Sequence, residues 1–226
     1  QKVAIAGNYL YSCSNGFSII DVSNPYNPLL ISGYDSAAFW AVDDRYAYLS
    51  GGWWSNPFIS IVDISDPYDI NFINNVNTIG MPVDMVISNG YLYVAEEVDD
   101  VGFRLEIFNV MKPDSATRVY SSIENDTIGQ FIICAGDYLY TASTENKVYI
   151  FDIENPTITQ FISSIEIPES ITDGWQISSI DIMNDILFLT LELEAPPHSM
   201  ILVDVSDPHN PEILSKNDFR EIVKNA

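Results

Sequence analysis

The chain has 226 residues, of which 47% are hydrophobic, and its 32 acidic and 9 basic residues give a net charge of -23. This charge argues against DNA or RNA as a partner, because binding to phosphates depends on lysine and arginine, and it disfavours an anionic membrane surface for the same reason. No apolar run reaches the roughly 18 residues of a membrane-spanning helix. The chain starts at Gln1 without a basic-then-apolar leader, so we expect a processed product or an excised piece.

Cysteine and histidine are too scarce for several kinds of site. Cys13 and Cys134 lie in apolar segments from different parts of the chain, which predicts two small buried side chains and no disulfide. His198 and His209 are the only histidines. We therefore expect no histidine-based metal cluster, haem site or Ser-His-Asp triad.

A hairpin signal recurs along the chain, first as Gly7-Asn8-Tyr9-Leu10-Tyr11. Tight hairpin turns need positive φ, which Gly and Asn adopt readily. Each copy predicts a first strand, a tight turn and a second strand whose aromatic residues pack between neighbouring sheets; an aromatic ladder for a ligand is the alternative. The later copies are Asp44–Tyr48, Asn89–Tyr93, Gly136–Tyr140 and the weaker Asn184–Phe188. The predicted first strands are Val3–Ala6, Trp40–Val42, Val83–Ile87, Phe131–Ala135 and Ile177–Met183.

A second landmark follows each hairpin, first as Ile19-Ile20-Asp21-Val22-Ser23-Asn24-Pro25. The aspartate can accept hydrogen bonds from N–H groups just downstream, and the proline removes a ladder donor, so the third strand ends there. We interpret the recurrent acid as a turn residue; repeated carboxylates for metal or acid chemistry are the alternative. The later copies end their strands at Asp63, Asn109, Asp152 and Asp204. The predicted fourth strands are Leu29–Tyr34, Asn71–Val76, Thr117–Ser122, Thr159–Ile165 and Glu212–Ser215, and Asp218–Asn225 is either a short helix or an extended end.

Five units of four strands, with a period of about 40 to 50 residues, are the sequence signature of a β-propeller. We predict one all-β domain over residues 1–226 with about five four-stranded blades. Five units fit either a complete ring or an arc of a larger one, and another chain could supply the closing contact, so self-assembly is one expectation. The predicted blades cover approximately residues 1–38, 39–80, 81–128, 129–174 and 175–226.

The two landmarks together resemble the LVIVD-repeat family of propeller proteins, in which Gly-Asn-Tyr-Ala-Tyr-Val-Ala precedes Leu-x-Ile-Val-Asp-Val-Ser-Asp-Pro-x-Asn-Pro. The third repeat departs from the pattern, with Asn109 in place of aspartate and Lys112-Pro113 in the turn. Such repeats occur mainly in secreted or surface-anchored proteins of bacteria and archaea, so the resemblance implies an extracellular or cell-surface location. It implies no catalytic residues.

Antiparallel strands place the first hairpin and the proline turn of every blade at one end. The other two connections lie at the opposite end, which we call the variable end. The separation between the second aromatic and the turn residue is 10 residues from Tyr11 to Asp21 but 16 from Phe188 to Asp204. Because variable loops tolerate insertions and commonly carry binding residues, we expect a protein or glycan partner at this end.

Aromatic residues at the variable end are the candidate ligand-binding residues. Trp53 and Trp54 stand in a turn-rich loop, where an indole offers contact area and a polar handle to sugars or proteins. The alternative is that both fold back onto the blade. Trp40, Trp175 and His198 are further candidates, although the loop at His198 reads equally as an exposed proline corner.

Four acids gather at the variable end of the third repeat: Glu96, Glu97, Asp99 and Asp100. Calcium takes six to eight oxygen ligands, to which these acids could contribute. Their spacing is not that of an EF-hand loop, and a solvated charge run is the alternative. Calcium is the sole cofactor that the sequence suggests.

Three functions are consistent with these patterns. The first is a non-enzymatic interaction or structural module on a cell surface or in an extracellular assembly. The second is a glycoside hydrolase or lyase, with Asp84 and Asp181 as paired carboxylates on inner strands. Their flanks are equally typical of strand residues bonded to neighbouring backbone. A calcium-binding surface module is the third.

Overall fold

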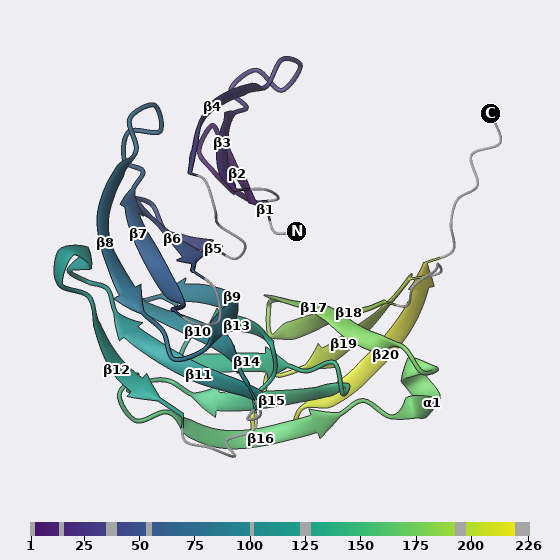
Figure 1. Ribbon diagram of the computed structural model, residues 1–226. Helices are drawn as coiled ribbons and strands as arrows, with labels where there is room; N and C mark the ends of the chain where they lie inside the picture. Colours follow the sequence, from purple (N-terminus) through teal and green to yellow (C-terminus); the bar gives the residue numbers. More distant parts are fainter. Residues whose placement is uncertain are drawn as a thin grey trace. The chain divides into compact units, whose positions relative to one another are not determined.

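The structure is a computed structural model and describes residues 3–13, 16–34, 40–52, 56–99, 102–122, 128–192 and 198–219. These residues form five sheets, each with four strands that pair in chain order (Figure 1). The protein is therefore an all-β propeller with five four-stranded blades, as the repeat period predicts. The chain divides into two compact units, unit 1 at residues 1–125 and unit 2 at residues 126–226.

Unit 1 contains the first three blades. Blade 1 consists of β1 (Val3–Ala6), β2 (Tyr9–Cys13), β3 (Phe17–Asp21) and β4 (Leu29–Tyr34). Blade 2 consists of β5 (Trp40–Val42), β6 (Tyr46–Gly51), β7 (Phe58–Asp63) and β8 (Asn71–Asn77). Blade 3 consists of β9 (Met81–Ser88), β10 (Tyr91–Val98), β11 (Gly102–Asn109), the short helical turn η1 (Pro113–Ser115) and β12 (Thr117–Ser121).

Unit 2 contains the last two blades. Blade 4 consists of β13 (Phe131–Ala135), β14 (Tyr138–Ala142), β15 (Lys147–Asp152) and β16 (Gln160–Glu166). Blade 5 follows the helix α1 (Glu169–Thr172) and consists of β17 (Gln176–Met183), β18 (Ile186–Glu192), β19 (His198–Asp204) and β20 (Glu212–Phe219). The repeat pattern does not predict α1. With four residues, α1 is the longest helix in the described ranges. No helix in these ranges is long and apolar enough to cross a membrane.

The residue that ends each third strand forms the same local turn in all five blades. Asp21 Oδ1 accepts a hydrogen bond from the backbone N–H of Ser23 at 2.8 Å. Asn109 Oδ1 accepts from Met111 N–H at 3.1 Å, so an amide serves as well as an acid. The other pairs are Asp63 with Ser65, Asp152 with Glu154, and Asp204 with Ser206. This turn accounts for the recurrent acid in the sequence.

A β-bulge interrupts the fourth strand at one position in every blade. In blade 1 the register between β3 and β4 shifts between Ile19 and Ile20. A bulge bends the strand and leaves one residue unpaired. The other shifts lie between Ile61 and Val62, Ile107 and Phe108, Ile150 and Phe151, and Leu202 and Val203. The edge strand of each sheet is therefore irregular.

Hydrophobic side chains of neighbouring blades pack face to face within each unit. The core between blades 1 and 2 includes Tyr11, Phe17 and Ile19 from blade 1 and Trp40, Ala47, Leu49 and Val62 from blade 2. The core between blades 2 and 3 includes Tyr48, Ile59 and Ile61 from blade 2 and Met85, Leu92, Val94 and Phe108 from blade 3. The core between blades 4 and 5 includes Tyr140, Ala142 and Ile150 from blade 4 and Leu187, Leu189, Ile201 and Val203 from blade 5. Burial on both faces explains why these strands read as apolar runs.

A polar link also joins neighbouring blades within each unit. Ser32 Oγ on β4 donates to the carbonyl of Pro67 in the turn of blade 2, at 2.5 Å. Ser163 Oγ on β16 donates in the same way to the Pro208 carbonyl of blade 5, at 2.5 Å. Asn74 Nδ2 makes a longer contact of 3.5 Å to the Pro113 carbonyl. The recurrent proline thus ends one strand and also supplies the acceptor for the preceding blade.

Candidate interaction site

The predicted tryptophans lie in different environments. Trp40 is buried between blades 1 and 2, where its ring stands edge-on to Phe17 at a centroid distance of 5.7 Å. Trp175 is partly buried and packs against the core between blades 4 and 5. Trp53 and Trp54 lie outside the described residues, as does the side chain of His198 at the start of β19. Ligand binding by these three residues stays a prediction.

The predicted acid cluster is split between the two faces of β10. Glu96 is completely buried, and its Oε2 accepts a hydrogen bond from the backbone N–H of Gly80 at 2.7 Å. Glu97 is exposed, since successive residues of a strand point to opposite faces. Asp99 is also exposed, and Asp100 lies outside the described residues. No three metal-ligating side chains come together in the described part of the chain, and calcium binding stays a prediction.

Glu96 has a buried partner that sequence reasoning missed. Glu106 on β11 is also completely buried, and a hydrogen bond joins the two carboxyl groups. Burial first, and then this bond to Glu106, raises the pKa of Glu96 far above its ordinary value. Arg118 Nε contacts Glu106 Oε1 at 2.6 Å, and Ile79 N–H donates to Glu106 Oε2 at 3.2 Å. The pair therefore combines one protonated acid with one ion pair, and it has no exposed surface to offer a substrate.

The two aspartates considered for hydrolysis belong to different units. Asp84 Oδ1 accepts from the adjacent backbone N–H of Met85 at 2.9 Å. Asp181 Oδ1 accepts from the adjacent N–H of Ile182 at 2.8 Å. These are local bonds of ordinary strand residues, and neither aspartate is among the residues that line the two hollows described next.

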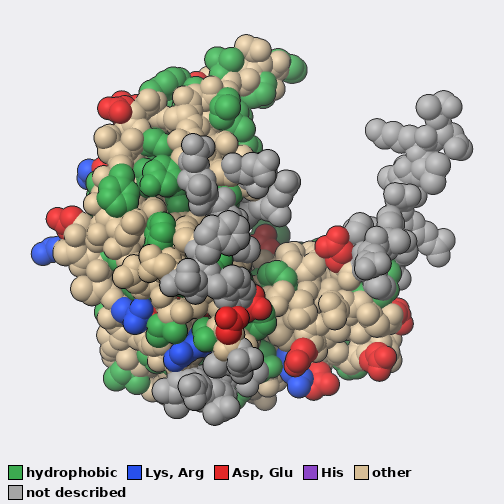
Figure 2. All heavy atoms as spheres, viewed as in Figure 1, with side chains coloured by type: hydrophobic (Ala, Val, Ile, Leu, Met, Phe, Trp, Pro, Cys, Tyr) green, Lys and Arg blue, Asp and Glu red, His purple; other side chains and the backbone are tan. Residues whose placement is uncertain are grey.

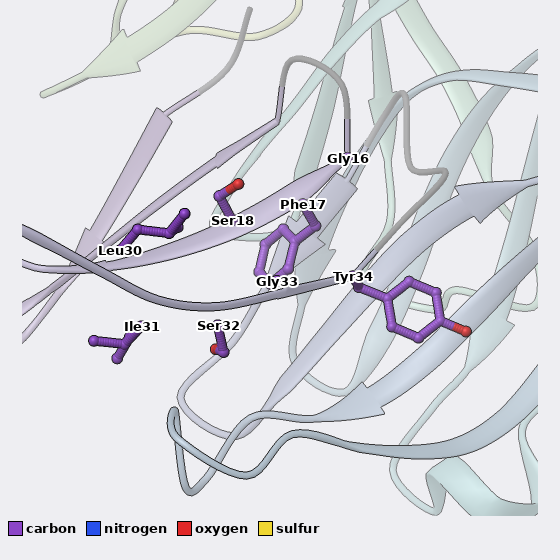
Figure 3. A pocket seen from close by; sticks show the side chains of 8 residues that line it. All are labelled: Gly16, Phe17, Ser18, Leu30, Ile31, Ser32, Gly33 and Tyr34. Carbon is purple, nitrogen blue, oxygen red and sulfur yellow. The ribbon is translucent and has the colours of Figure 1, made fainter.

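One hollow lies at the variable end of blade 1 and has a volume of about 450 Å³. It is lined by Gly16, Phe17, Ser18, Leu30, Ile31, Ser32, Gly33 and Tyr34 (Figure 3). Figure 3 shows the ring of Phe17 beside Gly33, while the ring of Tyr34 points away from the other labelled side chains. A Cβ atom at Gly33 would stand 2.7 Å from the Phe17 carbonyl oxygen, so glycine permits the close approach of β3 and β4. None of the described residues that line this hollow is charged.

A second hollow, of about 500 Å³, lies at the variable end of blades 4 and 5. Its polar groups are the Glu192 carboxylate at the end of β18, the Gln176 amide at the start of β17, and the hydroxyls of Thr144 and Ser178. Phe131 provides an aromatic edge. The remaining lining residues are Gly174 and Ile177, which flank Trp175 and Gln176 in sequence. We call this the blade 4–5 hollow.

Asn146 holds the backbone next to the blade 4–5 hollow in place. Its Nδ2 donates to the Trp175 carbonyl at 2.8 Å, and its Oδ1 accepts from Ile177 N–H at 3.0 Å. Its own carbonyl accepts from Ile167 N–H at 2.8 Å. Asn146 has a left-handed backbone with φ of 62°, a conformation that asparagine tolerates better than most residues. A turn asparagine in Thr144-Glu145-Asn146-Lys147 was the sole sequence signal for this role.

The surface carries both apolar and acidic side chains. Figure 2 shows hydrophobic side chains reaching the surface over the part of the chain formed by the first blades, and acidic side chains scattered both there and elsewhere on the visible face. Large apolar side chains that are more than half exposed include Val3, Ile5, Tyr26, Leu30, Phe72, Phe161, Met183 and Leu214. Several of these belong to the first and last blades.

The sheets and the junctions between them define the class of protein, a β-propeller. Residues 1–36, 41–78 and 130–166 match the profile of the LVIVD repeat. The chain is an LVIVD-repeat β-propeller, as the two sequence landmarks indicate. No curated protein sequence matches it.

Solved structures share the fold at low sequence identity. A Lactobacillus plantarum protein has a TM-score of 0.71 and 13% identity, over 94% of this chain and 65% of its own. A proposed 6-phosphogluconolactonase from Bacteroides uniformis has the same TM-score and identity, over 93% of this chain and 68% of its own. The computationally designed Ika8 protein has a TM-score of 0.59 and 7% identity, over 83% of this chain and 54% of its own. The chain thus spans between about half and two thirds of the length of these structures.

Proposed function

We propose that the chain is a non-enzymatic recognition module of a secreted or cell-surface protein, and that it binds glycans at the blade 4–5 hollow. The observation that carries this proposal is the composition of the hollow. Residues that carry a carboxylate, an amide and two hydroxyl groups line it together with a partly buried aromatic residue. Sugars present hydroxyl groups and apolar C–H faces together, which is the combination that these side chains complement.

The charge of the protein selects among glycans. Glu192 lies in the hollow, and the chain as a whole has a charge of -23. Polymers with sulfate or uronic acid groups would meet repulsion that is weakened by salt. We therefore expect neutral oligosaccharides, or sugars with free amino groups, as ligands.

The test is titration of the protein with neutral, amino-containing and acidic oligosaccharides, monitored by calorimetry. Gln176→Ala removes one hydrogen-bonding group and should weaken binding about 3- to 10-fold. This factor corresponds to the free energy of one hydrogen bond, about 0.5–1.5 kcal/mol. Ser18→Ala, in the hollow of blade 1, is the matched control and should leave affinity unchanged. Failure of all neutral and amino sugars to bind, or equal loss from both variants, would contradict the proposal.

A further inference from the structure

Two polar residues of the blade 4–5 hollow are opposite each other on adjacent strands. Gln176 at the start of β17 pairs with Glu192 at the end of β18 in the ladder between these strands. Paired residues of an antiparallel ladder point to the same face of the sheet, and their side chains are close neighbours. Both residues are exposed, and both line the hollow. The amide and the carboxylate can therefore contact the same group of a ligand.

A β-bulge adds a hydroxyl group to the same strand. The register between β17 and β18 shifts between Ile177 and Ser179, so Ser178 is the extra residue of β17. A bulge commonly redirects a side chain next to a functional site. The Ser178 hydroxyl donates to the Thr190 carbonyl at 3.3 Å, which uses its one O–H. The lone pairs of Ser178 Oγ are left for a donor from a ligand.

The side chains of the hollow thus offer mainly hydrogen-bond acceptors. A carboxylate only accepts, and the amide of Gln176 has an accepting oxygen as well as a donating nitrogen. Within the described part of the chain, the side chains of Gln176 and Glu192 have no hydrogen bond or ion pair of their own. A ligand that matches this hollow therefore brings several N–H or O–H donors.

The basic side chains of unit 2 are already paired with other acids. Lys147 Nζ lies 3.6 Å from Glu166 Oε2, and Lys216 Nζ lies 2.6 Å from Asp173 Oδ2. These are the two lysines among the described residues of unit 2, which include no arginine. Neither lysine is paired with Glu192. The carboxylate of Glu192 is therefore the charge that a ligand meets in the hollow, and it favours a cation.

We propose that the hollow selects sugars with a free, protonated amino group, and that Glu192 and Gln176 bind this group. An ammonium group has three N–H donors and a positive charge, which the Glu192 carboxylate, the Gln176 amide oxygen and Ser178 Oγ can accept. Phe131 lines the same hollow, and the face of an aromatic ring attracts cations. This inference rests on the proposed glycan binding and narrows its ligands from neutral and amino sugars to amino sugars.

The test compares two ligands that differ at the nitrogen alone. Glucosamine oligomers and N-acetylglucosamine oligomers of equal length are titrated into the 226-residue chain by calorimetry, at about pH 6, where amines are largely protonated and carboxylates ionised. We expect the free amine to bind about 3- to 10-fold more tightly, a modest factor because Glu192 is exposed to solvent. Added NaCl should reduce this preference, because salt screens the attraction.

Glu192→Gln removes the charge from the hollow and keeps the size of the side chain. This variant should bind both oligomers with the affinity that the unaltered chain has for the acetylated one. Glu145→Gln is the matched control, since Glu145 is an exposed acid that follows the lining residue Thr144 but does not line the hollow itself. It should keep the preference for the free amine. Equal losses from the two substitutions would mean that the net charge of the chain selects the amine, and would overturn the proposal.

The outcomes separate this inference from glycan binding itself. Equal affinity of the unaltered chain for the two oligomers, or tighter binding of the acetylated one, overturns the selection of amino sugars and leaves glycan binding intact. A preference for the free amine that persists in Glu192→Gln overturns the role of Glu192. If neither oligomer binds, the proposed glycan binding fails, and the selection of amino sugars fails with it.

Discussion

The carboxyl groups of Glu96 and Glu106 are hydrogen bonded to each other in the interior of blade 3, and neither side chain has exposed surface. They lie on one face of the sheet, because Glu106 pairs with Val94 across β10 and β11 and Glu96 is two residues further along β10. Blade 5 has Leu191 and Ile201 at the corresponding positions. Two acids thus replace two aliphatic side chains, and burial keeps a proton on Glu96.

Replacement of Glu96 by glutamine should stabilise the protein above neutral pH. The folded chain keeps the proton on Glu96, whereas the unfolded chain releases it above the ordinary pKa of 4.5. The unfolded state then binds fewer protons than the folded state, so the free energy of unfolding falls as the pH rises above 4.5. The glutamine of Glu96→Gln does not titrate, so this loss of stability is absent in the variant. At pH 8 the variant should therefore have a higher free energy of unfolding than the unaltered protein, by at least about 1.4 kcal/mol, which corresponds to a pKa shift of one unit.

Urea unfolding of both proteins between pH 4 and pH 9 measures this effect. The difference in stability should shrink as the pH falls toward the ordinary pKa of the acid. Glu97→Gln, next in sequence but exposed, is the control and should show no such trend. A pH-independent difference between Glu96→Gln and the unaltered chain would mean that Glu96 is ionised in the folded protein.

The turn at Asp204 should tolerate an amide but not an aliphatic side chain. Hydrogen bonds from the backbone and side chain of Ser206 lower the pKa of Asp204, so its stabilising effect is lost as the pH falls through the folded pKa. Asp204→Asn keeps the acceptor, as Asn109 does in blade 3, and should melt close to the unaltered protein. Asp204→Ala should melt at a lower temperature at pH 7. Thermal unfolding by circular dichroism checks both, and equal melting temperatures for the two variants would refute the turn role.

Loss of the Asn146 side chain should destabilise unit 2 and weaken glycan binding together. Asn146→Gly keeps the left-handed backbone accessible but removes the bonds to Trp175 and Ile177. We expect a loss of about 1–3 kcal/mol in urea unfolding, because two partly buried backbone groups lose their partners. Asn89→Gly changes another left-handed asparagine, which is exposed in a hairpin turn, and serves as the control. Similar losses from both substitutions would show that the backbone, and not the side chain, determines the effect.

The link between blades 4 and 5 should contribute measurably to stability. Ser163→Ala removes the hydroxyl that donates to the Pro208 carbonyl and should cost about 1 kcal/mol. Ser164→Ala alters the neighbouring exposed serine, for which we expect a change within about 0.5 kcal/mol. Chemical unfolding of the two variants in parallel makes the comparison. No difference between them would exclude the Ser163 bond as a stabilising element of the junction.

The architecture could be predicted from the sequence because its signals are local and repeated. Asp21 ends its strand through a hydrogen bond from the Ser23 N–H, and Pro25 lacks the N–H that a continued strand would need. This turn recurs in every blade with little change. Five sheets in chain order follow from those signals alone. The short helix at Glu169–Thr172 departs from the repeat and could not be predicted from it.

The candidate site was less accessible to prediction, because it depends on contacts between distant segments. Glu96 and Glu97 form one acidic run in the sequence, but the alternation of a strand sends them to opposite faces. The role of Asn146 depends on the backbone of Trp175, about 30 residues further along the chain, which no local pattern encodes. The blade 4–5 hollow lies at the variable end, but its lining residues were not among the predicted ones, and the binding face expected at that end stays a prediction.

The bulge in every fourth strand has a consequence for colloidal behaviour. These strands are the edges of their sheets, and a long regular edge invites pairing with other chains and growth of cross-β aggregates. A bulge breaks the regular spacing of the unpaired N–H and C=O groups, so an incoming strand cannot align with them over its full length. A chain that is 47% hydrophobic and carries five such edges is thereby protected against fibril formation at every one of them.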